Sequence, residues 1–170
     1  MSENVDTKID NKISEDLSPT RNLTGLHLKI VAAIAIIWSL FQLWYASPFP
    51  FIFNIGMFKG LPARAIHLGF ALLLAFLIFP ISRNKKISIF DILISIFSAF
   101  CCLYIYFFYD QLVDRGGVLL NISLGENINI PIELIIGICG ILILLEATRR
   151  VIGKPLAIIA ICFLLFSYFG

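Results

Sequence analysis

The chain has 170 residues, of which 59% are hydrophobic and only 14% are charged, with a formal net charge of +2 and a mean hydropathy of +0.95. Soluble domains carry about 25% charged residues. The composition therefore excludes an ordinary soluble domain and is typical of a polytopic membrane protein. The positions of the charges are more informative than their sum, because most of them lie between long apolar runs.

The N-terminal segment 1–24 is polar, has mixed charge, contains Pro19 and shows no apolar periodicity. We predict that it is a disordered cytoplasmic tail. It does not resemble a signal peptide, because the basic start is missing and the apolar run that follows is too long.

Four apolar runs predict transmembrane helices, each near the length of about 20 residues that a bilayer requires. They cover approximately residues 26–46, 63–81, 87–109 and 131–145. The segment 47–62 between the first two is rich in Phe but interrupted by Pro and Gly. We expect it to lie on the membrane surface or against other helices.

A fifth apolar run extends from Pro155 to Gly170. As a helix it would rise about 22 Å, at ~1.5 Å per residue, which is less than the roughly 30 Å of a hydrocarbon core. Either this run is a short buried or re-entrant segment, or it begins a helix that belongs to a longer protein.

The expected fold is therefore an all-α membrane protein with four transmembrane helices and an incomplete fifth. We divide it into a tail (1–24), a four-helix membrane domain (25–150) and the truncated start of a connecting helix (151–170).

The Lys and Arg residues predict the orientation. With the N-terminus in the cytoplasm, ten of the thirteen lie on the inner side. The inner loops are short, so the positive-inside rule applies to them. We expect a cytoplasmic N-terminus and multiple passes through the membrane.

Charged residues inside apolar runs are candidates for function, because each costs at least ~2.5 kcal/mol near the membrane centre. Asp91 and Glu133 both lie near the ends of their runs. We therefore do not expect a proton relay or an ion pathway from this chain alone.

We expect no cofactor, no metal ion and no catalytic residue. His27 and His67 fall at different depths in the expected topology and cannot share a haem iron. The four cysteines lie inside apolar runs, where we interpret them as small buried hydrophobic residues. No catalytic sequence motif is present, so the chain does not look like an enzyme.

Two groups of residues are candidates for helix packing or domain docking. Arg64 and His67 share a helix face, and Gly69 forms a small-xxx-small pair with Ala65 that would let another helix approach closely.

The second group is Glu146, Arg149 and Arg150, whose spacings of three and four residues place the carboxylate beside both guanidinium groups. This group is either an intrahelical ion pair that anchors the topology or a latch that docks a neighbouring domain.

The strings LPARAIHLGFALLLAFLIFP (61–80) and LLEATRRVIGKPLAIIAICFLLFSYFG (144–170) resemble the front part of fused permeases of tripartite ATP-independent periplasmic (TRAP) transporters of the TAXI type. FYDQLVDRGG (108–117), which lies between them, fits the same pattern. The resemblance covers about residues 38–170, and the polar tail carries no signal of the family.

The resemblance implies a scaffold function. In such permeases a small four-helix part enlarges the fixed scaffold, against which a large part of about twelve helices moves substrate by symport with an ion. A periplasmic solute-binding protein delivers an organic acid, typically a dicarboxylate. The large part is missing from this sequence, so no substrate-binding residue is assigned, and we expect the chain to be incomplete without it.

The partners implied are the lipid bilayer, a large TRAP permease part or subunit and a periplasmic solute-binding protein, and not a nucleic acid. The alternative hypothesis is a small membrane assembly or adaptor protein that is unrelated to transport.

Overall fold

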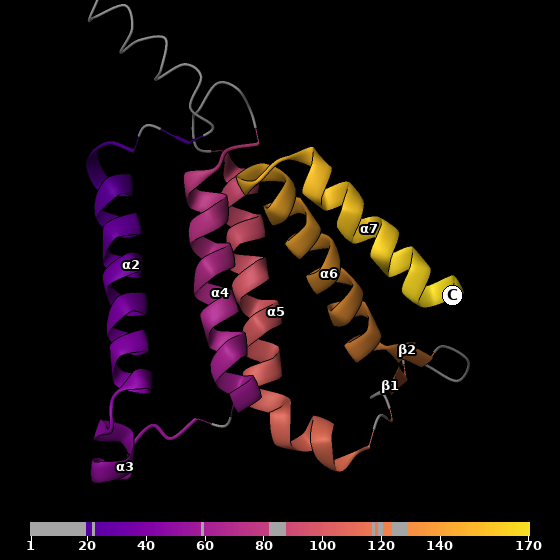
Figure 1. Cartoon of the computed structure of the whole chain (residues 1–170), viewed down its shortest axis with the longest axis horizontal. Coiled ribbons are helices and arrows are strands. Elements are labelled where there is room, and N and C mark those ends of the chain that lie inside the picture. The colour runs from indigo at the N-terminus through magenta and orange to yellow at the C-terminus, as the bar shows by residue number, and fades with distance from the viewer. Residues whose placement is uncertain are drawn as a thin grey trace, which may run out of the picture.

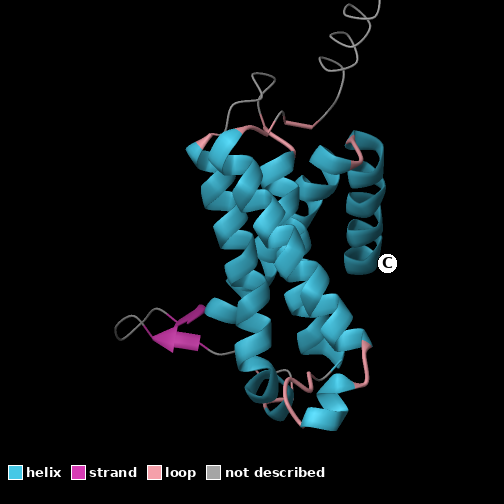
Figure 2. Ribbon diagram, turned by 90° about the vertical axis from the view of Figure 1, so that its left-hand side faces the viewer, coloured by secondary structure: helices cyan, strands magenta, loops and turns pink. Residues whose placement is uncertain are grey.

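The computed structural model describes residues 20, 21, 23–58, 60–81, 88–116, 118, 121–123 and 129–170. In this part of the chain the elements are α2 (Gly25–Ala46), α3 (Phe49–Phe53), α4 (Gly60–Ile78), α5 (Ile89–Asp114), β1 (Asn121–Ser123), β2 (Asn129–Pro131), α6 (Ile132–Val151) and α7 (Lys154–Phe169). Helices dominate, as the composition predicts. The all-α fold class is supported, and the one strand pair among the described residues is β1 with β2, which is short, antiparallel and projects from the helices (Figure 2).

Three of these helices, α2, α4 and α5, are long and apolar enough to cross a membrane. Each begins and ends close to its predicted boundaries, except that α5 continues to Asp114, beyond the predicted end at Tyr109. The Phe-rich segment 47–62 is not wholly irregular, because it contains the five-residue helix α3.

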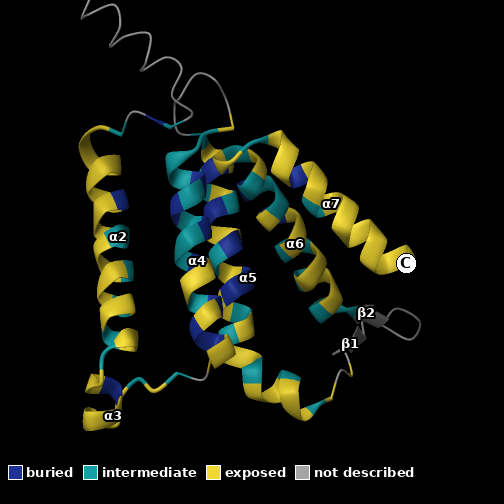
Figure 3. Ribbon diagram, viewed as in Figure 1, coloured by how far each residue is buried: buried dark blue, intermediate teal, exposed yellow. Residues whose placement is uncertain are grey.

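Helices α4 and α5 form the centre of the structure, with α2 on the far side of α4, α6 beside α5, and α7 outside α6 (Figure 1). The core residues come from α4, α5 and α6 and are Leu72, Phe76, Cys101, Cys102, Ile143 and Ala147. Figure 3 shows that buried residues concentrate on α4 and α5, whereas α2 and α7 are mostly exposed. Such exposed apolar surface is what a helix presents to lipid.

The contact between α4 and α5 depends on small and polar side chains. A Cβ added to Gly69 would lie 3.3 Å from Cβ of Cys102, so the two helices touch closely at this point. Ser95 donates a hydrogen bond of 3.1 Å to the carbonyl of Leu73, and the Ser98 hydroxyl bonds the carbonyl of Ser95 at 2.7 Å. Close helix approach at small residues is a common packing mode in membranes.

Local signals explain several helix ends. Ser88 caps α5, because its hydroxyl accepts a hydrogen bond from the N–H of Phe90 at 3.4 Å. Between α6 and α7 the chain turns at Gly153, whose φ of +116° is accessible to glycine and strained for other residues. Pro155 then occupies the first turn of α7, where its missing N–H costs little.

Two sequence interpretations need correction. Cys101 and Cys102 are buried, but Cys162 is exposed, so the interpretation as buried hydrophobic residues is wrong for that cysteine. The expectation of a disordered tail up to residue 24 is wrong for Arg21, which is buried. Most of the expected tail, residues 1–19 and residue 22, lies outside the described residues.

Candidate functional site

The most strongly organised polar group lies where α4 ends, α5 begins and α6 ends. All three of these helix termini meet at one end of the bundle, which also receives the segment before α2 (Figure 1). We call this group the Asp91 cluster, and it consists of Arg21, Asp91, Glu146, Arg149 and Arg150.

Asp91 is at the centre of the cluster. It lies in the first turn of α5, where the helix N-terminus favours an anion, and it is 0% exposed. Its two oxygens have different partners: Oδ2 binds Nη2 of Arg21 at 2.7 Å, and Oδ1 binds Nη1 of Arg150 at 2.8 Å. The buried carboxylate is therefore shared by two guanidinium groups from distant parts of the chain.

Arg21 also satisfies the end of α4. Its backbone N–H donates to the carbonyl of Ile78 at 2.9 Å, and its Nη1 donates to the carbonyl of Leu77 at 2.8 Å. The last carbonyls of a helix have no partner within the helix and must find one elsewhere. Arg21 supplies these donors, and it joins α4 to α5 through Asp91.

Arg150 provides the link to α6. Besides binding Asp91, its Nη1 lies 3.4 Å from the carbonyl of Phe79, and its Nε donates to Oε1 of Glu146 at 2.8 Å. The guanidinium carbon lies 4.9 Å from the centre of the Phe76 ring, in a cation–π arrangement.

Glu146 connects the buried part of the cluster to its exposed edge. It follows the last residue of the apolar run 131–145, and Arg149 donates to both of its oxygens at 2.7 Å. Hydrogen bonds from Arg149, and secondarily from Arg150, lower the pKa of Glu146 to about 2, although burial acts in the opposite direction. The Arg149 side chain is 42% exposed, whereas that of Arg150 is 5% exposed.

The energetic consequence follows from this burial. Removing one partner of a buried ion pair typically costs about 3–5 kcal/mol, because the other charge is left uncompensated. An exposed pair contributes about 0–1 kcal/mol. Within the cluster, Asp91 and Arg150 therefore carry the stabilisation of the bundle, Arg21 fastens the segment before α2 to it, and Arg149 contributes little.

The structure brings together only one of the two groups of residues singled out from the sequence. Glu146, Arg149 and Arg150 form the ion pairs that their spacing predicts, and Arg150 in addition reaches α5. That second contact was not predicted.

The other group is dispersed over three environments. Gly69 faces α5, while Arg64 is exposed. His67 faces α2, where its ring lies 5.0 Å from that of Trp38, and Nε1 of Trp38 approaches its Nδ1 at 3.4 Å.

The sequence reasoning missed Arg21 and the central position of Asp91. A signal for Asp91 was present, because Ser88, Asp91, Ser95 and Ser98 follow one another at spacings of three, four and three within an apolar run. This spacing places them on one helix face, and a polar stripe in a membrane helix usually faces protein. Nothing comparable in the tail points to Arg21.

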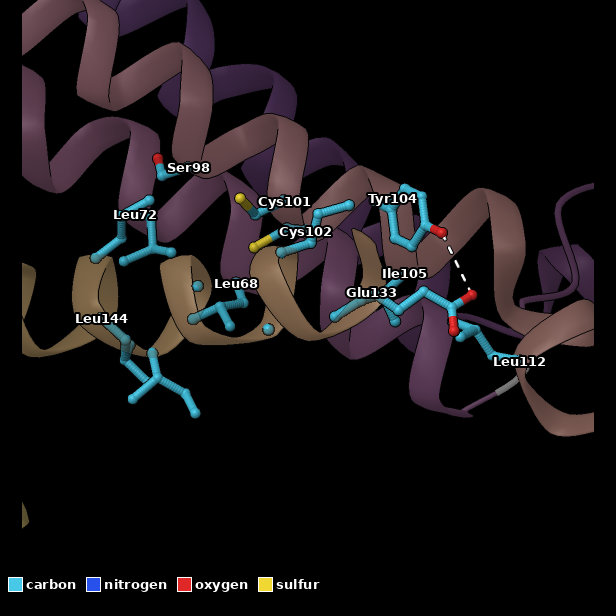
Figure 4. Close-up of a pocket in the computed structure, with 15 residues that line it drawn as sticks. Leu68, Leu72, Ser98, Cys101, Cys102, Tyr104, Ile105, Leu112, Glu133 and Leu144 are labelled. Atoms are coloured by element: carbon cyan, nitrogen blue, oxygen red, sulfur yellow. Dashed lines mark hydrogen bonds between the residues drawn. The ribbon is translucent and has the colours of Figure 1, made fainter. Parts of the chain in front are cut away.

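A second ion pair lies at the other end of α6. Glu133, in the first turn of α6, binds Nη2 of Arg115 at 2.7 Å and accepts a long hydrogen bond of 3.5 Å from the hydroxyl of Tyr104. Glu133 borders a cavity of about 290 Å³ between α4, α5 and α6 (Figure 4). Apart from Glu133, Tyr104, Ser98 and two cysteines, the cavity wall consists of apolar side chains and glycines.

The described residues contain no group of three or more His, Cys, Asp or Glu side chains arranged to hold a metal ion. The Asp91 cluster has salt-bridge chemistry, in which guanidinium groups hold a carboxylate and helix carbonyls. This arrangement fastens segments of chain together.

Comparison of the chain with protein-family models, with curated proteins and with solved structures finds no match.

Proposed function

We propose that the chain is the small scaffold portion of a TRAP permease of the TAXI type, in a bacterial inner membrane. It acts with a large transport part and a periplasmic solute-binding protein in the ion-driven uptake of an organic acid. The observation that carries the proposal is the Asp91 cluster, which fastens the ends of α4, α5 and α6 through buried ion pairs of 2.7–2.8 Å. A scaffold must stay fixed while another domain moves against it, and such fastening suits that task.

The positions of charge support the same reading. Within α5 and α6 the charged residues lie towards the helix ends, and ion pairs are formed there by Asp91, Glu133, Glu146, Arg149 and Arg150. A transport pathway would instead place ionisable groups or irregular backbone near the bilayer centre.

The contacts of the cluster also support four membrane crossings. Arg21, Asp91 and Arg150 touch one another, so the segment before α2, the start of α5 and the end of α6 lie on one side of the membrane. The chain must then cross the membrane an even number of times between these segments. Helices α2 and α4 are the two crossings between Arg21 and Asp91, and α5 and α6 are the two crossings between Asp91 and Arg150. Helix α6 has 20 residues, which rise about 30 Å and match the thickness of the hydrocarbon core.

The positive-inside rule places the Asp91 end in the cytoplasm. Arg149 and Arg150 are in the last turn of α6, and Lys154 begins α7 at the same end. We therefore infer four spans with a cytoplasmic N-terminus, and α7 directed away from the cytoplasm.

The strings that resemble TRAP permeases coincide with helix contacts of this structure. The string 61–80 contains Gly69, at a close contact of α4 with α5, and the string 144–170 contains Glu146 and Arg150. The resemblance thus covers residues that hold the bundle together.

The proposal is tested by reconstitution into proteoliposomes with an imposed sodium gradient. We expect no uptake of a labelled dicarboxylate by this chain alone, and uptake when it is combined with a large TRAP permease part from the same cell and its binding protein. Uptake by this chain alone would contradict the proposal. Equal uptake by the large part with and without this chain would favour the adaptor hypothesis.

A further inference from the structure

The contacts of Arg21 distinguish it from the other members of the Asp91 cluster. Arg21 precedes α2 and belongs to neither of the two helices, α4 and α5, whose ends it contacts. Its side chain is 2% exposed and donates to the Leu77 carbonyl and the Asp91 carboxylate, and its backbone N–H donates to the Ile78 carbonyl. We call the described residues of this segment, Thr20, Arg21, Leu23 and Thr24, the strap.

The bundle supplies a site for the Arg21 side chain from its helix ends. The Leu77 carbonyl belongs to α4, and Asp91 belongs to α5. Arg150 of α6 binds Oδ1 of Asp91 and leaves Oδ2 directed at Arg21. A carboxylate oxygen and a carbonyl oxygen side by side match the planar fork of a guanidinium group, and a compact ammonium ion fits them less well.

The part of α2 next to the strap is packed loosely. A cavity of about 260 Å³ separates it from α4 and α5, with a wall that includes His27 and Val31 of α2, Leu77 of α4 and Ile92 of α5. The ring contact of α2 with α4 at Trp38 and His67 lies further along the helix. Side-chain packing therefore contributes little to holding the first turns of α2 in place.

We propose that α4, α5 and α6 form a guanidinium-binding site that Arg21 fills in cis, and that this attachment holds the strap and the first turns of α2 against the bundle. Because Asp91 keeps Arg150 as a partner when Arg21 is absent, the site persists when it is empty. The strap is then a releasable attachment, and α2 is the helix that it releases.

The first experiment is hydrogen exchange by mass spectrometry on the full chain in nanodiscs, comparing wild type with Arg21→Ala. We expect faster exchange in residues 25–34 of the variant and unchanged exchange in α4 and in residues 89–102. Arg21→Lys should give an intermediate result, because it keeps the charge and loses the fork. Arg115→Ala, which removes a paired arginine at the opposite end, is the matched control and should leave residues 25–34 unchanged.

The second experiment asks whether the emptied site takes a free guanidinium ion. In Arg21→Ala, tens of millimolar guanidinium should raise the midpoint of thermal unfolding in a saturable way by about 2–4 °C, since a ligand that binds only the folded state stabilises it. Wild type and Arg115→Ala should show no such rise, and neither sodium chloride nor urea at the same concentration should replace guanidinium. Exchange in residues 25–34 should remain fast, because the free ion fills the site without attaching the strap.

Three results would overturn the proposal. Unchanged exchange at the start of α2 in Arg21→Ala would show that the strap does not hold this helix. Faster exchange throughout α4 and α5 would make Arg21 part of the core and not a releasable group. Equal effects of guanidinium on wild type and variants would exclude a specific site. None of these readouts involves transport, so they test the strap independently of the proposed scaffold function.

Discussion

Asp91 and Glu133 are similar residues in similar positions with different surroundings. Each is an acidic residue in the first turn of a helix, and each binds an arginine at 2.7–2.8 Å. The two carboxylates lie near opposite ends of α6. Asp91 binds Arg150 in the last turn of this helix, and Glu133 is in its first turn. Arg150 and Glu133 are 17 residues apart, which is about 26 Å at ~1.5 Å per residue.

The difference is in the counter-ions. Both arginines that hold Asp91 are buried, with side chains 2% and 5% exposed, whereas the Arg115 side chain that binds Glu133 is 24% exposed. A long cationic side chain near a membrane surface can move its charge into water when its partner is lost. Arg115 has that route open to it, and Arg150, which is held in the last turn of α6, does not. We infer that the Asp91 end fixes the bundle and the Glu133 end tolerates change.

The largest effect is therefore expected at Asp91. Asp91→Asn removes the buried negative charge that two guanidinium groups share and should lower the free energy of unfolding by about 3–5 kcal/mol. Glu133→Gln, the matched substitution at the other end, should cost about 1 kcal/mol or less. Unfolding of both variants by SDS titration measures the difference, and equal costs would contradict the distinction between the two ends.

The next largest effect separates two adjacent arginines. Arg150→Ala should cost about 3–5 kcal/mol, because it breaks the buried ion pair that joins the start of α5 to the end of α6. Arg149→Ala should cost about 0.5 kcal/mol, because that side chain is 42% exposed and pairs only at the edge of the cluster. The same titration applies, and a larger loss for Arg149→Ala would show that the exposed edge carries the stabilisation.

A smaller effect is expected from acid at the edge of the Asp91 cluster. The pKa of Glu146 is lowered from 4.5 to about 2, chiefly by hydrogen bonds from Arg149. A lowered pKa gives stability that is fully present above about pH 4.5 and is lost as the pH falls towards 2. The stability difference between wild type and Glu146→Gln should therefore be constant from pH 8 to pH 5 and shrink below that. A difference that stays constant down to pH 2 would mean that the arginines do not lower the pKa of Glu146.

The sequence predicted the helices better than the contacts between their ends. Long apolar runs and the Pro and Gly residues between them are local features, so α2, α4 and α5 were recognisable. The pairing of Glu146 with Arg149 and Arg150 was also predictable, because it lies within one helix.

Contacts between distant segments left weaker signals. Arg21 binds Asp91 across 70 positions of sequence, and nothing in the polar segment around Arg21 marks one of its charges as buried. Asp91 lies on a polar stripe whose spacing was visible, but the stripe alone identifies no partner. The β1–β2 hairpin was missed for a related reason, since short strands depend on pairing across a loop.

The smallest effect is expected at Tyr104, which supports the Glu133 end. Its hydroxyl lies 3.5 Å from Oε1 of Glu133, at the outer limit of a hydrogen bond, while Arg115 binds the same carboxylate at 2.7 Å. Tyr104→Phe should therefore change the free energy of unfolding by about 0.5 kcal/mol or less, below the ~0.5–1.5 kcal/mol of an ordinary hydrogen bond. The variant Tyr104→Phe with Glu133→Gln should show an additive cost, because a weak contact implies little coupling. Strong non-additivity would mean that Tyr104 and Glu133 are tightly coupled, as the residues of the Asp91 cluster are. The two carboxylates would then differ only in how deeply their arginines are buried.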